Sequence, residues 1–181
     1  MESPSAVIVT PRLELRPITF EQARAILEGR RRQEIDELVG AEMPWQWPTR
    51  VLVEQVFRAS LEDLIEDPAS RLWGDRFIVT REGPPKVVGS VIFHGRPGAD
   101  GVADIGYGIE ETSQGQGIAT EALGACIKWA LAQPECRIIR AETSAWHKPS
   151  LSVLEKVGLR VVGEHDAAGT KMLVYEVKRS F

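Results

Sequence analysis

The chain has 181 residues, of which 43% are hydrophobic and 27% charged, and its formal net charge is −4. A chain of this length and composition can bury a core without disulfides or metal ions. The small negative charge gives no broad attraction to nucleic acid or to anionic lipid, so we expect neither as a partner. Since no repeat or long linker divides the chain, residues 1–181 are expected to form one domain.

Cysteine and histidine usage gives a first indication of the compartment. Cys126 and Cys136 are the only cysteines and form no CxxC pair, which is typical of a reduced protein. His94 and His165 are too isolated in sequence to suggest a metal site. No stretch approaches the roughly 18 apolar residues of a membrane span, and the N-terminus lacks a signal-peptide pattern. We therefore expect a cytoplasmic protein without a metal.

The N-terminal elements follow from caps and prolines. Residues 13–16 read as a strand that ends at Pro17, and Thr19 with Gln22 forms a capping box for a first helix. The basic run 30–32 is interpreted as the solvated end of that helix. Residues 43–48 contain two prolines and predict a loop.

That loop presents two tryptophans, Trp45 and Trp47, which are interpreted as core anchors or as a border of a binding site. After it, apolar residues at helical spacing over 53–64 predict a second helix.

The middle of the chain predicts strands. Residues 77–80 and 87–94 form a hairpin around the turn residues 82–85. Residues 103–109 alternate, so that the apolar side chains share one face while Asp104 shares the other face with two glycines.

The C-terminal part alternates helices and strands. Apolar spacing from Ala119 predicts a long helix that Pro134 ends, followed by a strand over 138–143. A helix over 150–157 is closed by Gly158, and strands over 159–163 and 172–177 complete a mixed α/β order.

The most informative loop is 113–120, between a strand and the long helix. Gly115 and Gly117 allow positive φ and close backbone approach, so N–H groups can converge on an anion at a helix N-terminus. The loop is neither a Walker A motif, because it lacks lysine, nor a GxGxxG fingerprint, because position 120 is threonine. Taken alone, it is either an ordinary turn or a phosphate cradle.

Read together, four blocks of sequence resemble the GNAT superfamily of N-acetyltransferases, in particular its RimJ/RimL-like branch. They are TPRLELRP (10–17), ADIGYGI (103–109), QGQGIATEAL (114–123) and SLSVLEKVGL (150–159). The resemblance covers roughly residues 8–178 and has its blocks in the family's order. It implies an α/β (α+β) fold, with a twisted, mixed and largely antiparallel sheet flanked by helices.

The resemblance also implies acetyl-CoA as cosubstrate, bound where the fourth and fifth strands splay apart. The cofactor-binding residues that it implies are Ile109, Gln114, Gly115, Gln116, Gly117, Ile118, Ala119, Thr120 and His147. His147 stands where the family usually has asparagine, whose amide helps to hold the pantetheine arm. We expect His147 to contact the pantetheine arm in its place. Homodimers are common in this family.

Two residues are candidates for catalysis. Asp104 is the candidate proton acceptor, and the alternative interpretation is a solvated surface acid. Glu110 and Glu111 could act through water or simply solvate their loop. Ser150 matches the family's serine near the CoA thiol, where a hydroxyl could protonate the leaving sulfur; otherwise it is a helix-start residue.

The function that these residues indicate is transfer of an acetyl group from acetyl-CoA to a primary amine, by direct attack in a ternary complex. The acceptor is a protein N-terminus or a small-molecule amine. The alternative is a catalytically silent acyl-CoA-binding or regulatory domain that keeps the loop without the chemistry.

Overall fold

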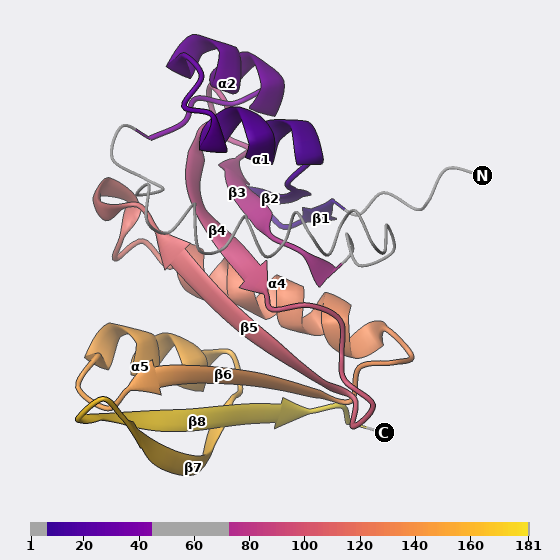
Figure 1. Cartoon of the computed structure of the whole chain (residues 1–181), viewed down its shortest axis with the longest axis vertical. Coiled ribbons are helices and arrows are strands. Elements are labelled where there is room, and N and C mark those ends of the chain that lie inside the picture. The colour runs from indigo at the N-terminus through magenta and orange to yellow at the C-terminus, as the bar shows by residue number, and fades with distance from the viewer. Residues whose placement is uncertain (1–6, 45–72, 181) are drawn as a thin grey trace.

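The computed structural model describes residues 7–44 and 73–180, which form an eight-stranded sheet in the order β1-β2-β3-β4-β5-β6-β8-β7 (Figure 1). The strands are β1 (Ile8–Val9), β2 (Leu13–Pro17), β3 (Arg76–Thr80), β4 (Val87–Phe93), β5 (Val102–Ile109), β6 (Ile138–Ser144), β7 (Arg160–Ala167) and β8 (Thr170–Lys178). Neighbouring strands pair antiparallel except β5 and β6, which are parallel. The mixed, largely antiparallel sheet that the resemblance implied is confirmed.

The helices among the described residues are α1 (Phe20–Leu27), α2 (Arg32–Val39), α4 (Ile118–Ala132) and α5 (Lys148–Lys156), with a short 3₁₀ turn η2 (Glu111–Ser113). None of them is long and apolar enough to cross a membrane. Trp45, Trp47 and the helix predicted over 53–64 lie outside the described residues.

The sheet opens between its two parallel strands. The pairing of β5 with β6 runs from Val102 opposite Ile138 to Asp104 opposite Arg140. Beyond that point β5 continues along β4 as far as Ile109, while β6 continues along β8 as far as Ser144. Each strand follows its antiparallel partner, and within the described residues the two no longer pair. Figure 1 shows the resulting wedge between β5 and β6.

Helix α4 covers one face of the sheet with its apolar side. Leu123, Cys126 and Ala130 are completely buried and belong to one cluster with Ile78 and Ile105 of the sheet. The 3.6-residue spacing of these apolar positions therefore placed the helix correctly.

Helices α1 and α2 cover the opposite face at the N-terminal side. Their apolar residues form a second cluster with Phe77 and Val79 of β3, whose neighbour Ile78 belongs to the α4 cluster. Because successive strand residues point to opposite faces, the two clusters lie on the two sides of the sheet.

Three aromatic rings, one of which belongs to Trp129 of α4, pack together with a buried arginine. The ring centroids of Trp73, Phe93 and Trp129 lie 5.1 to 5.8 Å apart. The Arg76 side chain is fully buried, and its guanidinium carbon lies 4.4 Å from the centroid of the Trp129 ring. A cation over an aromatic face is favourable in such a site because the contact is shielded from water.

Helix ends that carry cap residues lie where the sequence predicted them. Thr19 and Gln22 form the capping box of α1. Helix α4 ends at Ala132, two residues before Pro134, and Gly158 follows α5 with φ +95°.

The interpretation of residues 30–32 as the end of the first helix is wrong. Helix α1 already ends at Leu27, and Arg31 is the N-cap of α2, so the arginines stand at a helix start. Cations are disfavoured there by the helix dipole. Each arginine instead has an acidic partner: Arg30 pairs with Glu28, Arg31 with Glu34 and Arg32 with Asp36.

The last two strands are longer than predicted because they form a hairpin. Strands β7 and β8 pair from Arg160 opposite Glu176 to Ala167 opposite Thr170. Ala168 and Gly169 connect them, both with positive φ, the backbone geometry of a tight hairpin turn.

Candidate active site

The glycine loop lies where the wedge opens. It leads from the end of β5 through η2 to Gly117, the N-cap of α4. Gly115 and Gly117 have φ values of +74° and +77°, which residues with a side chain rarely adopt. A Cβ atom on Gly115 would meet nothing within 4 Å, so the backbone there is openly accessible. The first N–H groups of α4 have no partner inside the helix, which makes this end suitable for an anion.

A cavity of about 580 Å³ extends from this loop to α5. It is bounded by the end of β5, the glycine loop, the first turn of α4 and one face of α5. Its lining residues are Tyr107, Gly108, Ile109, Ser113, Gln114, Gly115, Gly117, Ile118, Ala119, Thr120, His147, Pro149, Ser150, Ser152, Val153 and Lys156.

Most of the residues that the sequence predicted for cofactor binding or catalysis line this one cavity. They are Ile109, Gln114, Gly115, Gly117, Ile118, Ala119, Thr120, His147 and Ser150. Gln116 and Asp104 do not line it. The Gln116 side chain donates instead to the backbone oxygen of Thr112 at 3.2 Å, and its own carbonyl accepts from Arg12 at 3.0 Å.

Ser150 lies between two polar side chains. Its Oγ is 2.6 Å from Nδ1 of His147, and it accepts a hydrogen bond from the Tyr107 hydroxyl at 3.3 Å. The N-cap of α5 is His147, and no side chain caps this helix, so Ser150 is not its capping residue. Strand β5 and helix α5 thus place three groups that can exchange protons at one wall of the cavity.

Tyr107 is the residue of this cluster that the sequence did not identify, because strand alternation puts it on the same face as the apolar residues of 103–109. It does lie on that face and packs partly against the core. Burial raises the pKa of its hydroxyl, and the hydrogen bond with Ser150 acts in the opposite direction. Its position near the end of β5 could have indicated the site, because the core face of the strand borders the gap between β5 and β6 there.

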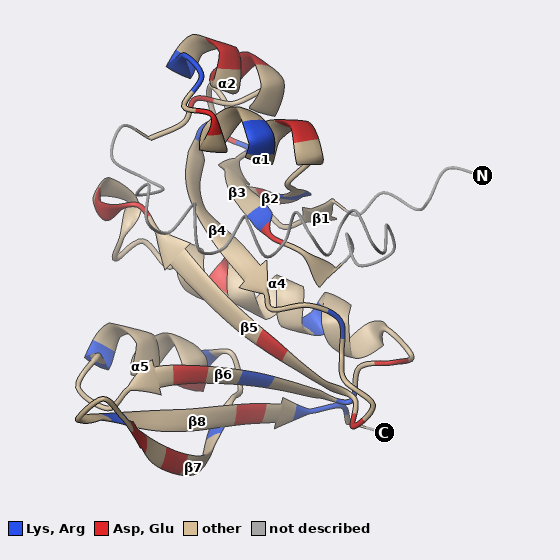
Figure 2. Cartoon of the chain, in the orientation of Figure 1, with Lys and Arg blue, Asp and Glu red and all other residues tan. Residues whose placement is uncertain are grey.

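Asp104 lies on the face of β5 that points away from α4. Its neighbours Ala103 and Ile105 are buried, whereas Asp104 is exposed. On the next strand Arg140 stands opposite it and donates to Glu176 at 2.7 Å. The bands of opposite charge across β5, β6 and β8 are visible in Figure 2.

His94 reaches the same face as Asp104. A Cβ atom on Gly106 would lie 3.6 Å from His94 Nε2, and the His94 N–H donates to the Asp104 carbonyl at 3.0 Å. Sequence reasoning treated this histidine as isolated, because the strand pairing that brings it to Asp104 is not local.

Glu110 is engaged inside its own loop. Its carboxylate accepts from the Thr112 N–H at 2.9 Å and from the hydroxyls of Thr112 and Ser113. Burial by itself raises the pKa of Glu110, but these hydrogen bonds outweigh it and hold the pKa below 4.5. A carboxylate stabilised in this way is a poor proton acceptor at neutral pH.

A second cavity, of about 690 Å³, adjoins the first and shares Ile109, Ser113 and Gln114 with it. Its walls carry charges of both signs, contributed by Arg32, Lys86, Glu42, Glu110 and Glu111. Such a mixed lining gives no strong preference for the charge of a molecule bound there.

Comparison with known proteins adds to this geometry. The family described as "Acetyltransferase (GNAT) domain" matches residues 12–160. An uncharacterized N-acetyltransferase of Bacillus subtilis (strain 168), YjdG, is 28% identical over 148 residues, covering 81% of this chain and 84% of that protein.

Two solved structures are similar over nearly their whole length. A putative GnaT-family acetyltransferase from Bordetella pertussis has a TM-score of 0.67 at 19% identity, covering 94% of this chain and 98% of that one. RimL, a ribosomal L7/L12 alpha-N-protein acetyltransferase in complex with coenzyme A, has a TM-score of 0.64 at 18% identity, covering 95% of this chain and 97% of that one. The family match spans most of the chain, and the protein therefore belongs to the GNAT acetyltransferase family.

Proposed function

We propose that this protein transfers the acetyl group of acetyl-CoA to a primary amine, either a protein N-terminus or a small-molecule amine. The observation that carries the proposal is one cavity with an anion-binding backbone loop at one end and the Ser150 cluster at its wall. The RimL structure, which has the same fold, was determined with coenzyme A.

The residues present fit a CoA molecule. Gly115 and Gly117 leave backbone N–H groups accessible at the start of α4, which suits a diphosphate held without a lysine. Beyond Asp104 the edge of β5 no longer pairs with β6, and its residues Tyr107, Gly108 and Ile109 line the cavity. An extended pantetheine arm with amide groups is suited to such a strand edge.

Acetyl-CoA, when bound, supplies an acetyl thioester. In the proposed transfer the amine nitrogen bonds to the acetyl carbon as the carbon–sulfur bond breaks, so the amine must lose a proton and the sulfur must gain one. Ser150 Oγ is the proposed proton donor. Tyr107 and His147 flank it and can return the proton that it gives.

Asp104 is the proposed acceptor of the amine's proton. It does not line the cavity, so it would act through water on the other face of β5. On that face Gly106 and Gly108 carry no side chains, and His94 Nε2 lies 3.6 Å from the position of a Cβ atom on Gly106.

The proposal is tested by incubating the protein with acetyl-CoA and a panel of amines while following the release of free thiol. The panel should contain peptides with different N-terminal residues and small amines such as amino acids. We expect thiol release that depends on at least one amine. Tight CoA binding without turnover on any amine would instead support the catalytically silent domain.

A further inference from the structure

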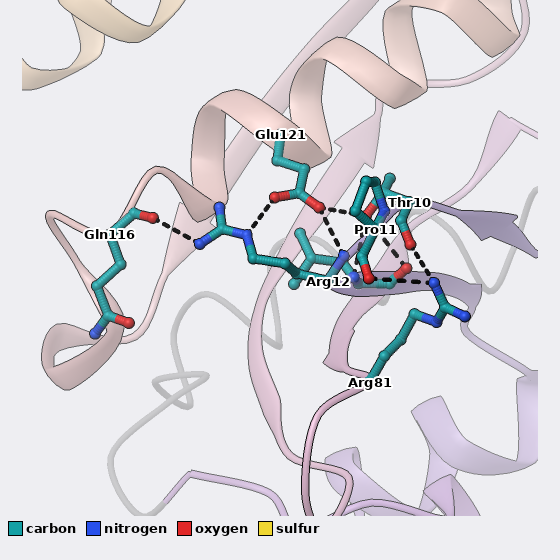
Figure 3. A network of polar contacts seen from close by, with 7 residues as sticks. Thr10, Pro11, Arg12, Arg81, Gln116 and Glu121 are labelled. Atoms are coloured by element: carbon teal, nitrogen blue, oxygen red, sulfur yellow. Dashed lines mark hydrogen bonds and ion pairs between the residues drawn. The ribbon is translucent and has the colours of Figure 1, made fainter.

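A network of polar contacts ties the N-terminal segment to the first turn of α4 (Figure 3). The Glu121 carboxylate accepts from the Thr10 hydroxyl at 2.6 Å, from the Arg12 N–H at 3.0 Å and from Arg12 Nε at 2.6 Å. These residues lie more than 100 positions apart in the sequence. One carboxylate thus fixes both the backbone and the side chain of Arg12.

The other end of the Arg12 guanidinium holds the glycine loop. Its Nη1 donates to the backbone oxygen of Gln116 at 3.0 Å. In a trans peptide the carbonyl and the following N–H point in opposite directions. Since the Gln116 carbonyl points to Arg12, the Gly117 N–H points away from it. Gly117 lines the cavity and Gln116 does not.

The Gln116 side chain also holds this loop, through its hydrogen bond to the Thr112 oxygen at 3.2 Å, but it does not bind the carbonyl of the Gln116–Gly117 peptide. Gly115 and Gly117 flank Gln116, both have positive φ, and a Cβ atom on Gly115 would meet nothing within 4 Å. Because Gly117 has no Cβ, its φ can change at low steric cost, so the Gln116–Gly117 peptide plane is free to rotate on that side. The nearest atom to a Cβ on Gly117 would be Arg12 Nη2, at 3.5 Å. Arg12 is therefore the contact, among the described residues, that binds the carbonyl of this peptide and favours one orientation.

Arg12 itself is held by the sheet. Its backbone oxygen accepts from the Arg81 N–H at 2.9 Å, and the Arg81 side chain donates to the carbonyls of Thr10 and Pro11. Burial by itself raises the pKa of Glu121, but the hydrogen bonds from Thr10 and Arg12 outweigh it and hold the pKa below 4.5. The carboxylate is thus ionised at neutral pH and pairs with Arg12.

We propose that Arg12 and Glu121 are a positioning pair that orients the Gln116–Gly117 peptide so that its N–H faces the CoA diphosphate. The inference rests on the proposed use of acetyl-CoA. In this role Arg12 acts through the loop and not as a phosphate ligand. Preorganising the loop lowers the cost of ordering it when the ligand binds.

Two substitutions separate positioning from direct attraction between Arg12 and a phosphate. Arg12→Ala removes both the contact and the charge. Glu121→Gln removes the negative charge and one of the two oxygens that hold Arg12 but leaves the positive charge of Arg12, so the loop becomes more positive. Direct attraction predicts unchanged or tighter CoA binding in Glu121→Gln, whereas positioning predicts weaker binding.

The experiment measures CoA affinity by calorimetry and turnover of acetyl-pantetheine, a shorter acetyl donor without the diphosphate. We expect both variants to bind CoA about tenfold more weakly, because a charge-assisted hydrogen bond network is lost. Turnover of acetyl-pantetheine should stay at the wild-type level. Glu164→Gln, which removes an exposed ion pair with Lys171 on the β7–β8 hairpin, is the matched control and should change neither quantity.

A second measurement does not depend on the ligand. In the ligand-free protein the amide signals of Gly115 and Gly117 should shift and broaden by NMR in both variants, and not in the control. If the wild-type protein binds no CoA, the proposed function fails while these spectra still decide whether the pair positions the loop. The inference would be overturned by unchanged glycine signals or by wild-type CoA affinity in Glu121→Gln. It would also be overturned if the variants lost as much turnover with acetyl-pantetheine as with acetyl-CoA.

Discussion

At the scale of single residues, the hydroxyl of Ser150 depends on neighbours from two elements. Tyr107 arrives from β5 and His147 from the turn before α5, and both contact Ser150 Oγ. A hydroxyl that is held from two sides loses little freedom when it acts, so its contribution should appear in the chemical step.

Replacing Ser150 by alanine tests this. A donor to the leaving sulfur acts mainly in the transition state, so Ser150→Ala should lower kcat by about 10²-fold or more while changing the KM for acetyl-CoA little. Steady-state kinetics with a saturating amine measure both. An unchanged kcat would leave Ser150 as a residue of the helix start only.

Asp104 makes a separate prediction. If it accepts the amine's proton, Asp104→Asn should lower turnover by about 10²-fold and alter the acidic limb of the pH profile. Wild-type turnover of this variant across about pH 6 to 9 would exclude Asp104 as the base. His94, which lies on the same face, would then be the next residue to replace.

His165 provides a pH prediction away from the site. Its Nε2 lies 2.9 Å from a Glu142 carboxylate oxygen, and this hydrogen bond raises the pKa of His165 above 6.5. A raised histidine pKa means that its contribution to stability is present below the unfolded value and is lost as the pH rises through the folded one. NMR titration should show the raised midpoint, and Glu142→Gln should lower it toward the ordinary value, while Asp166 keeps part of the shift. The same midpoint in both proteins would contradict the pairing.

At the scale of elements, the glycine loop depends on backbone conformation. Gly117 has φ +77°, which a β-branched residue adopts only with strain, and its Cβ would approach Arg12 Nη2. Gly117→Val should therefore abolish CoA binding while the chain stays folded. Calorimetric titration with a parallel thermal melt checks both points. Normal CoA affinity in the folded variant would remove the loop from the site.

Elements with a local signal could be predicted, and the others could not. The capping box of α1 and the apolar spacing of α4 are local patterns, and both helices lie where expected. Helix α2 has a partial local signal, since Ile35, Leu38 and Val39 share one face and Gly40 follows it with φ +67°. It was missed because this run is short, five of its eight residues are polar, and its N-cap makes no side-chain capping bond. Only packing against the sheet makes such a segment a stable helix.

The same distinction applies to the site. The loop could be predicted as a continuous stretch, because glycines and a helix start are neighbours in sequence. The contact of Tyr107 with Ser150 spans 43 positions and that of Arg12 with Glu121 spans 109. Strand alternation tells which face a residue occupies, but not which distant residue it meets there.

At the scale of the whole molecule, the two parts of the sheet meet through the short β5–β6 pairing. Strands β1 to β5 lie on one side of it, and β6, β8 and β7 lie on the other with α5 beside them (Figure 1). Helix α4 contacts β4 and β5 on one side and β6 and α5 on the other. The cavity likewise has one wall from β5 and one from α5.

This arrangement has a consequence for cooperative unfolding. Helix α4 and one apolar cluster span both parts, but the strands pair at only three positions at the junction. We therefore expect β6–β8–β7 and α5 to open as a separate unit, at a lower free energy than strands β3 and β4. A ligand that spans both walls binds only when this unit is closed. CoA at about 100 times its Kd should therefore add about 2.7 kcal/mol to the opening free energy of β6 and β8 amides in hydrogen exchange. Equal protection of both units without CoA would show instead that the sheet unfolds as one.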